Sequence, residues 1–356
     1  MNKEIINKIL EVAVNAPSGE NSQPWRFEVN SNKIHIFNLP ERDRSLYNFG
    51  QKGSLVAHGA LIENILITAP IFGYNAEIDL LPDNKDFDFI ATISLVELLP
   101  DQQKNESLYS CIVKRVTNRK PYKNIPLSDE QLKDLKNVEN EIGEGRVIFV
   151  YDPEKMKDIA NLCSVNERVM FENKLIHNFF FDHINWTEKE ELEKRLGFYI
   201  KTLELPSPVQ FALKLFRYWP AMNLFNKLGL NKIIAKGNAV NYANASAMVA
   251  FAVKNNTSRD FIIAGRLMQR LWLKVTKMGL SAQPMAGMLF FMQAISGGET
   301  SKFSSSQIEL IKNAHENVKK TFDINNEMPV MIFRVGYGGE PSARSSKKPP
   351  EIIFKN

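Results

Sequence analysis

Three side chains that could hold a phosphate alternate along the segment Arg115-Val116-Thr117-Asn118-Arg119. Alternate residues of an extended chain point to the same face, so Arg115, Thr117 and Arg119 would project together. Two guanidinium groups and a hydroxyl form bidentate, charge-assisted hydrogen bonds to a phosphate. The alternative interpretation is a solvated basic loop, which is the better one for an isolated pattern of this kind. The segment therefore predicts a phosphate site only together with other motifs.

Two further segments carry groups suited to a flat heterocycle. The polar loop Ser18–Asn21 lies between an expected helix and an expected strand, and it offers hydroxyl, amide and backbone N–H groups that could read a ring edge. The segment Pro284-Met285-Ala286-Gly287 combines the fixed φ of proline with a residue that lacks Cβ, so its backbone can approach a ring closely. A simple turn and a helix-to-strand connector are the respective alternatives.

Positive charge gathers once more near the C-terminus, at Arg344, Lys347 and Lys348, directly after the last expected strand. These three side chains could add to a phosphate site, or they could belong to a solubilising tail.

The sequence contains no recognisable motif for a metal site, a catalytic nucleophile or a dinucleotide-binding loop. The five histidines show no metal-binding spacing, and Cys111 and Cys163 are isolated from each other. No phosphate-binding Walker motif and no nucleophile elbow occurs. The glycine-rich string Gly336–Gly339 has no helix after it, which argues against a dinucleotide fold. We therefore expect neither a metal ligand nor a catalytic nucleophile.

The composition is that of an ordinary globular protein. Of the 356 residues, 44% are hydrophobic and 24% are charged, and the 45 basic residues are answered by 40 acidic ones, which argues against a nucleic-acid partner. Two cysteines fit a reducing compartment. The N-terminus lacks the pattern of a signal peptide, and we expect no run that approaches the roughly 18 apolar residues of a transmembrane helix. We expect a cytoplasmic protein with no membrane span.

The pattern of apolar residues predicts an α+β protein in two parts. The first part has a helix over 2–16, a hairpin of strands over 24–29 and 33–38, a buried helix over 53–68 that stops at Gly73, and strands over 76–81 and 87–96. The second part has a capping box at Ser128 and Gln131, a strand over 146–151, a helix over 153–172, an apolar helix over 266–278 that ends at Gly279, and a strand over 329–335.

An insertion at about 179–240 interrupts the second part. Between Lys201 and Lys236 it contains six basic residues and one acidic residue, Glu204, on amphipathic turns. A basic amphipathic helix could bind a membrane surface. A helical lid over the core is the interpretation we favour, because Pro206, Pro208 and Pro220 divide the insertion into pieces too short to bind a membrane independently.

Taken together, these motifs resemble the nitroreductase-like flavoprotein superfamily, and the resemblance spans nearly the whole chain. The string Pro17-Ser18-Gly19-Glu20-Asn21-Ser22-Gln23-Pro24-Trp25 is its most specific part. The resemblance implies that Pro17, Ser18, Gly19, Asn21 and Gln23 contact the flavin ring system of FMN, and that the segment 284–287 covers one side of it. It also implies that the FMN phosphate is held by the residues Arg115, Thr117, Arg119, Arg344, Lys347 and Lys348.

The order of the motifs departs from the usual one, in which the basic segment precedes the Pro-Ser string. Here the basic segment follows about ninety residues later, and each part of the chain lacks what the other provides. This is similar to the single-chain branch of the superfamily, in which two related halves are fused and share one site. We therefore expect halves at 1–105 and 106–356, one FMN, and a monomer that is an internal pseudo-dimer or only loosely paired.

The resemblance implies an FMN-dependent oxidoreductase that takes hydride from NAD(P)H and reduces a nitro compound, a quinone or a similar small-molecule electron acceptor. An FMN-sequestering protein with little turnover is the alternative, since the aromatic insertion could block access to the ring. Ala286 also occupies a position where many active relatives have an acidic or polar residue. Flavin-consuming, benzimidazole-forming relatives are a third possibility that no residue supports specifically.

Overall fold

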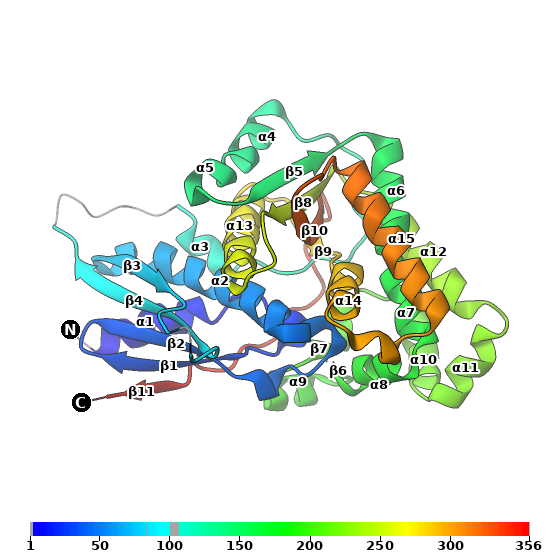
Figure 1. Ribbon diagram of the computed structural model, residues 1–356, viewed down its shortest axis with the longest axis horizontal. Coiled ribbons are helices and arrows are strands. Elements are labelled where there is room, and N and C mark those ends of the chain that lie inside the picture. Colours follow the sequence, from blue (N-terminus) through cyan, green and yellow to red (C-terminus); the bar gives the residue numbers. More distant parts are fainter. Residues whose placement is uncertain (1–2, 84, 100–106, 356) are drawn as a thin grey trace.

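Two sheets with the same strand order form the framework of the protein (Figure 1). The computed structural model describes residues 3–83, 85–99 and 107–355. One sheet has the order β1-β2-β4-β3 and the other β5-β8-β10-β9, and every neighbouring pair within these two sets is antiparallel. The strands are β1 (Trp25–Asn30), β2 (Lys33–Asn38), β3 (Tyr74–Leu80), β4 (Phe89–Glu97), β5 (Arg146–Val150), β8 (Ala247–Val253), β9 (Ser281–Pro284) and β10 (Met328–Gly336).

A long helix occupies the same place in each half. Helix α2 (Lys52–Thr68) joins β2 to β3, and α13 (Ser258–Lys277) joins β8 to β9. A left-handed glycine precedes the following strand in both cases, Gly73 with φ 82° and Gly279 with φ 70°. The equivalent sheets, helices and turns confirm the expected α+β fold of two related halves.

The two long helices pack against each other through glycines. A Cβ on Gly59 would lie 2.0 Å from the carbonyl oxygen of Ile262, and a Cβ on Gly265 would lie 2.0 Å from the carbonyl oxygen of Val56. Each contact joins a glycine to the residue three positions before the other glycine, so the two contacts are reciprocal. A contact of this kind is expected around a local two-fold axis. Glu63 of α2 is fully buried there and pairs with Arg266 and Arg270 of α13.

Helix α2 is apolar on nearly all sides because it is the core helix of the first half. With the turns around it, over Leu46–Phe72, it is long and apolar enough to pass as a membrane span, and 78% of its most apolar window is buried inside the protein. We expected no apolar run as long as a membrane span, and this expectation was wrong as far as length and composition are concerned. The burial explains the apolar character without a membrane.

The insertion replaces a tight turn. Residues 31–32 alone connect β1 to β2, whereas the equivalent strands β5 and β8 are connected by residues 151–246. The inserted segment is thus longer than the expected 179–240. It contains α6 (Pro153–Cys163), α7 (Val165–Glu172), α8 (Lys174–Asp182), β6 (Ile184–Asn185), α9 (Glu188–Lys194), β7 (Phe198–Tyr199), α10 (Ser207–Phe216), α11 (Trp219–Asn226) and α12 (Leu230–Ala243).

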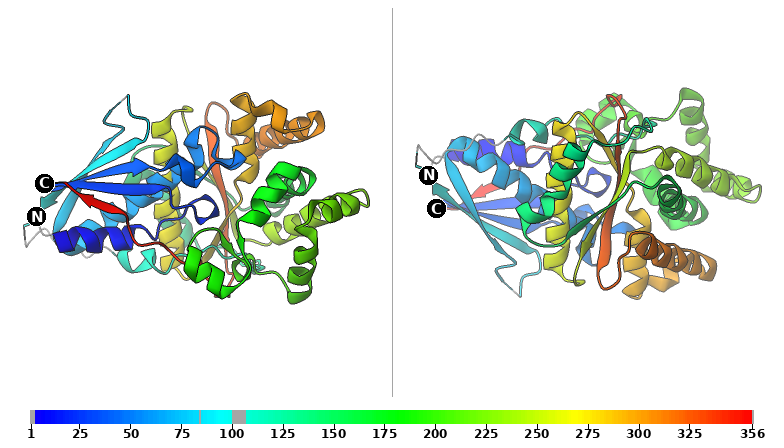
Figure 2. Two further views of the ribbon diagram at one scale, coloured as in Figure 1. Left: turned by 90° about the horizontal axis from the view of Figure 1, so that it is seen from below. Right: turned by 90° about the horizontal axis from the view of Figure 1, so that it is seen from above.

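The C-terminal segment returns from the second half to the first. After β10 it runs along the protein, and β11 (Ile352–Phe354) pairs in parallel with β1 (Figure 2). Both chain ends consequently lie at the end of the molecule away from α10 and α11 (Figure 1). The remaining helices are α1 (Lys3–Ala13), α3 (Tyr109–Ile112), α4 (Asp129–Lys136), α5 (Val138–Ile142), α14 (Gly287–Ser296) and α15 (Ser305–Thr321).

Several expected elements need correction. The helix over 153–172 is two helices, α6 and α7, that meet at Ser164, whose hydroxyl donates back to the carbonyl of Asn161 at 2.8 Å. The helix expected over 266–278 begins at Ser258, because Thr257 and Asp260 form a capping box. Strands β8 and β11 were not predicted. The expected boundary between the halves, at 105 and 106, involves the stretch 100–106, which lies outside the described residues.

Candidate functional site

The polar loop between α1 and β1 has an unusual backbone. Glu20, Asn21 and Gln23 all have positive φ, at 44°, 55° and 50°, in the left-handed region that few non-glycine residues occupy. The loop is closed by Ser18, whose hydroxyl accepts a hydrogen bond from the backbone N–H of Gln23 at 3.0 Å. Such strain persists only where surrounding contacts fix the conformation, and it is common at ligand sites.

The C-terminal tail fixes this loop. Lys347 donates from Nζ to the carbonyl of Ala16 and to Oδ1 of Asn21, each at 2.8 Å. Asn21 donates to the carbonyl of Ser346 at 3.0 Å, and the backbone N–H of Lys348 donates to Oε1 of Gln23 at 2.8 Å. Hydrogen bonds that involve side chains therefore connect two segments that are more than 300 residues apart in the sequence. The structure brings the expected ring-binding loop and the expected basic tail together.

Arg115 lies beside the same tail. It donates from one terminal nitrogen to the carbonyl of Asn15 at 2.9 Å, and its guanidinium lies 4.5 Å from the centre of the Trp272 ring. Its Nε is buried and has no hydrogen-bond partner. Burial, and then the nearby charge of Arg344, lowers the pKa of Arg115 to about 9. The lowered value means that this cation lacks a compensating anion.

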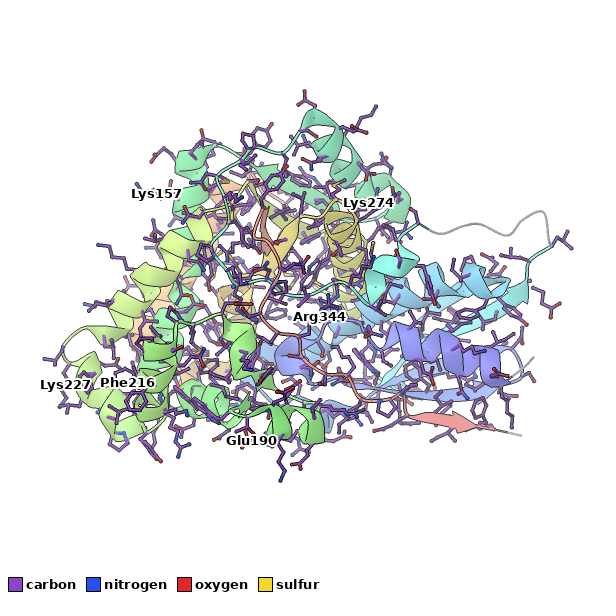
Figure 3. The ribbon with its side chains drawn as sticks, turned by 180° about the vertical axis from the view of Figure 1, so that it is seen from behind. Lys157, Glu190, Phe216, Lys227, Lys274 and Arg344 are labelled. Atoms are coloured by element: carbon purple, nitrogen blue, oxygen red, sulfur yellow. The ribbon has the colours of Figure 1, made fainter. Side chains whose placement is uncertain are left out.

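Lys347 and Arg344 complete a group of three cations, which we call the cation cluster, with Arg115. Burial, and then Arg115, lowers the pKa of Lys347 to about 7. The negative charge of Glu191 acts in the opposite direction and offsets only part of this lowering. Arg344 donates to the carbonyls of Val113 and Lys114 and lies along the C-terminal tail (Figure 3). Like charges crowded in a partly buried place favour the binding of an anion.

Arg119 lies in different surroundings from Arg115. It donates to the carbonyl of Thr202 at 2.9 Å and lies 5.8 Å from the ring centre of Phe198. Burial lowers the pKa of Arg119, an effect that the nearby Tyr242, Tyr122 and Glu204 oppose and the nearby Arg334 increases. Thr117 pairs through its backbone with Ala282. Arg115 and Arg119 thus contact different carbonyls and different rings of the protein, and their joint binding of a phosphate with Thr117 stays a prediction.

The segment from Pro284 to Gly287 ends β9 and begins α14. Met285 donates its N–H to the carbonyl of Ile332 at 2.8 Å, and both Met285 and Ala286 are buried. A Cβ on Gly287 would lie 2.0 Å from Oδ1 of Asn166 and 3.1 Å from the ring of Tyr47. A larger residue would require the Asn166 side chain to shift, so glycine permits this close approach. The segment thus faces two side chains that the sequence did not single out.

Those side chains belong to a polar group that sequence reasoning missed: Tyr47, Asn166, Glu167 and Tyr242. Asn166 and Tyr242 donate to Oε1 of Glu167 at 3.0 and 2.8 Å. Tyr47 stacks on Phe291 with ring centres 4.6 Å apart, and burial, followed by Glu20 and Glu167, raises its pKa. Tyr47 therefore lies between the Ser18 loop and Glu167. Asn166 and Glu167 are neighbours on one helix, but Tyr47 and Tyr242 are more than 70 residues away from them, so no local spacing identified the group.

Buried polar atoms without partners occur throughout this region. They include Nε of Arg115, Oε2 of Glu20, Oδ1 of Asn166 and Oε2 of Glu167. Buried polar atoms in proteins almost always have a hydrogen-bond partner, so a group of unpartnered ones indicates a place where a ligand or water supplies it. One of these four atoms is a donor nitrogen, and the other three are carboxyl or amide oxygens.

A small cavity of about 150 Å³ lies on one side of the Ser18 loop. Glu20 and Asp43 line it together with Phe179 and His183 of the insertion. Burial, and then Asp43, raises the pKa of Glu20 to about 8, so this carboxyl is mostly protonated at neutral pH. Within the described part of the chain, no group of three or more His, Cys, Asp or Glu side chains is placed to hold a metal ion.

Comparison with known proteins gives relatives of two kinds. No family model matches the chain. An uncharacterised protein of Mycobacterium tuberculosis is 22% identical over 344 residues, which cover 96% of this chain and 47% of that protein. A protein of the same species named among the NAD(P)H nitroreductases is 29% identical over 119 residues, or 33% of this chain and 34% of that one. Another of that group is 26% identical over 125 residues.

Over about a third of its length the chain is similar to proteins named as NAD(P)H nitroreductases. It spans about half the length of the first relative and a third of the length of the second. Among solved structures, the chain is similar to an FMN-dependent nitroreductase of Mycobacterium smegmatis in complex with NADPH, at 14% identity, 65% and 87% coverage and a TM-score of 0.36. A nitroreductase with bound FMN from Desulfitobacterium hafniense gives 14% identity, 69% and 94% coverage and a TM-score of 0.34.

Proposed function

We propose that the protein binds one FMN between its two halves and reduces nitro compounds, quinones or similar acceptors with electrons from NAD(P)H. The observation that carries this proposal is the cation cluster beside the strained Ser18 loop. Arg115 has a buried, unpartnered Nε, and burial followed by the nearby Arg115 lowers the pKa of Lys347. A phosphate would neutralise both and accept the free N–H.

The remaining residues fit a heterocycle with both donors and acceptors on its edge. Oδ1 of Asn166 and Oε2 of Glu167 are buried acceptors without partners. Burial raises the pKa of Glu167, so its carboxyl can also donate when it is protonated. At Gly287 a Cβ would lie 2.0 Å from Oδ1 of Asn166, so the absence of a side chain lets the backbone approach Asn166 closely. The chain would thus hold and orient the ring through Asn166, Glu167 and the backbone at Gly287, while FMN when bound supplies the redox chemistry.

A second function, sequestration of FMN with little turnover, is favoured by one specific observation. The insertion is fastened across the site by its backbone: the carbonyl of Arg195 accepts from Gln23 at 2.7 Å, and that of Thr202 accepts from Arg119 at 2.9 Å. The segment 195–202 would therefore cover the site and restrict entry of nicotinamide. For either function we propose a cytoplasmic protein that needs no second copy to complete its site.

The phosphate assignment is tested by comparing two ligands on two variants. Arg115→Ala removes a charge-assisted contact worth about 1.5–3 kcal/mol, so FMN affinity should fall about ten- to a hundredfold. Riboflavin lacks the phosphate and should bind wild type and variant almost equally. Arg146→Ala is the matched control, since Arg146 is half-exposed on β5 and pairs with Glu327. Full FMN affinity in Arg115→Ala would show that the phosphate binds elsewhere.

The choice between reduction and sequestration needs a rate. The FMN-loaded protein is mixed anaerobically with NADPH and the flavin absorbance near 450 nm is followed over time. Rapid bleaching, followed by reoxidation with a quinone or nitroaromatic, supports the reductase. Flavin that stays oxidised for hours although it is tightly bound supports sequestration.

A further inference from the structure

The insertion exposes an unusual amount of apolar surface at one end of the molecule. In the described part of the chain, nineteen large apolar side chains are exposed, and nine of them lie within residues 209–240. We call the exposed face of α10, α11 and α12 the hairpin surface. Its apolar members are Val209, Phe211, Leu215, Tyr218, Leu224, Phe225, Leu228, Ile233 and Val240. Isolated exposed apolar residues are common on proteins, but a contiguous group marks an interaction site.

The spacing shows that these residues form faces of helices. Phe211 and Leu215 are four residues apart on α10, with 76% and 52% of their surfaces exposed, and Leu213 between them is buried. Leu224 and Leu228 repeat this spacing at the end of α11. Ile233 and Val240 are two turns apart on α12, whose opposite face is buried through Ala235 and Ala239. Each helix therefore has one face in the protein and one apolar face in solvent.

The charge of this region is of one sign. Residues 205–259 contain no Asp or Glu, although the whole chain has 40. Five exposed cations lie among the apolar side chains: Lys214, Arg217, Lys227, Lys232 and Lys236. Within the part of the chain that the structure describes, none of the five forms an ion pair. The hairpin surface is thus complementary to a partner that is both apolar and anionic.

The hairpin surface is held in place by contacts on its inner side. The carbonyl of Phe216 accepts from Nε2 of His177 at 2.8 Å, and the Trp219 ring lies 5.2 Å from the ring of His177. Asn226 donates to the carbonyl of Phe171 at 2.6 Å. Phe216 and Lys227 lie at the extremity of the molecule (Figure 3), away from Arg344 in the proposed site. The apolar face is therefore a fixed part of the fold.

We propose that the hairpin surface binds the surface of an anionic lipid bilayer. The apolar side chains would enter the boundary between headgroups and acyl chains, and the five cations would contact lipid phosphates and carboxylates. The proline-separated pieces are each too short for this alone, which is why the sequence favoured a lid. The fold joins α10, α11 and α12 into one surface and so removes that objection. The segment 195–202 contacts the proposed site, whereas the hairpin surface faces outward.

Sedimentation with vesicles tests the proposal on the full chain. Wild type should bind phosphatidylcholine vesicles that contain about one-third phosphatidylserine, and it should bind pure phosphatidylcholine at least tenfold more weakly. Added salt should weaken the binding, because exposed charges are screened. The double variants Phe211→Ser with Leu215→Ser, and Lys227→Glu with Lys232→Glu, should each lose at least tenfold in affinity.

Matched controls distinguish binding by the hairpin surface from non-specific binding by other exposed residues. Phe87→Ser removes an apolar side chain that is 85% exposed on the first half, and Lys133→Glu with Lys157→Glu reverses two exposed charges elsewhere. Both should bind anionic vesicles as wild type does, and circular dichroism checks that all variants are folded. Equal loss in controls and variants, or no binding of wild type to anionic vesicles, overturns the proposal. Self-association that depends on Phe211 and Leu215, without vesicle binding, overturns it in favour of a second copy.

Discussion

Substitution of Gly59 by alanine should destabilise the contact between the two halves more than any ordinary Gly-to-Ala change in a helix. The new Cβ would lie 2.0 Å from the Ile262 carbonyl oxygen and 2.9 Å from Cα of Gly265, whereas ordinary contacts begin at 3.4 Å. Both neighbours are backbone, so α2 and α13 would have to separate locally by about 1.4 Å. Overpacking of a core costs about 1–3 kcal/mol, and a backbone clash between two long helices should reach at least the upper end.

Urea unfolding followed by circular dichroism measures this cost. The matched control is Gly237→Ala in α12, where a Cβ meets nothing within 4 Å, so the variant should be stabilised by up to about 1 kcal/mol. The double variant Gly59→Ala with Gly265→Ala should cost less than the sum of the single changes, because the first separation of the helices makes room for the second methyl. If Gly59→Ala is as stable as Gly237→Ala, the close helix crossing is wrong.

Two further predictions concern pH. The pKa of Glu20 is raised to about 8 by burial and then Asp43, so the stability that its proton provides is present at low pH and is lost as pH rises from about 4.5 through 8. Glu20→Gln should remove that loss, and urea midpoints at pH 5, 7 and 9 check it: equal pH dependence in variant and wild type would contradict the assignment. The pKa of Lys347 is lowered to about 7, chiefly by burial, and a bound phosphate should raise it again. FMN affinity should therefore weaken as pH rises from 7 to 9, by up to about tenfold per pH unit, and Lys347→Met should abolish the trend in fluorescence titrations.

The elements that could be predicted have either a regular alternation or a long apolar run. Strands β1 and β2 alternate in burial, whereas α2 is buried on nearly all sides over 17 residues, a length that fits a helix better than a strand. The structure has these elements within one or two residues of the predicted bounds. Strand β8 is buried along its whole length, so its run of apolar residues lacks the alternation of a half-exposed strand. Strand β11 has three residues, and it forms only because β1 offers an edge. Residues 151–246 connect β5 to β8 as residues 31–32 connect β1 to β2. This correspondence can be recognised only when the strand orders of the two sheets are compared.

Some residues of the candidate site could also be predicted from the sequence, and others could not. The Pro-Ser string, the basic tail and Arg115 have recognisable residue types, and the structure brings these segments into contact. The different protein contacts of Arg115 and Arg119 could not be predicted, because each is made with a segment far away in the sequence. Asn166 and Glu167 enter the site only because α7 of the insertion packs against Gly287 and Tyr47. A long-range contact of this kind leaves no local pattern.

The most direct test of the shared site is the stoichiometry of FMN. Purified protein is stripped of flavin and titrated with FMN at a concentration well above the dissociation constant, and its mass in solution is measured by sedimentation in the same buffer. One site built from the loop of the first half and the tail of the second predicts one FMN per 356-residue chain, bound by a monomer. Two FMN per chain, or binding that occurs only in a dimer, would contradict the account.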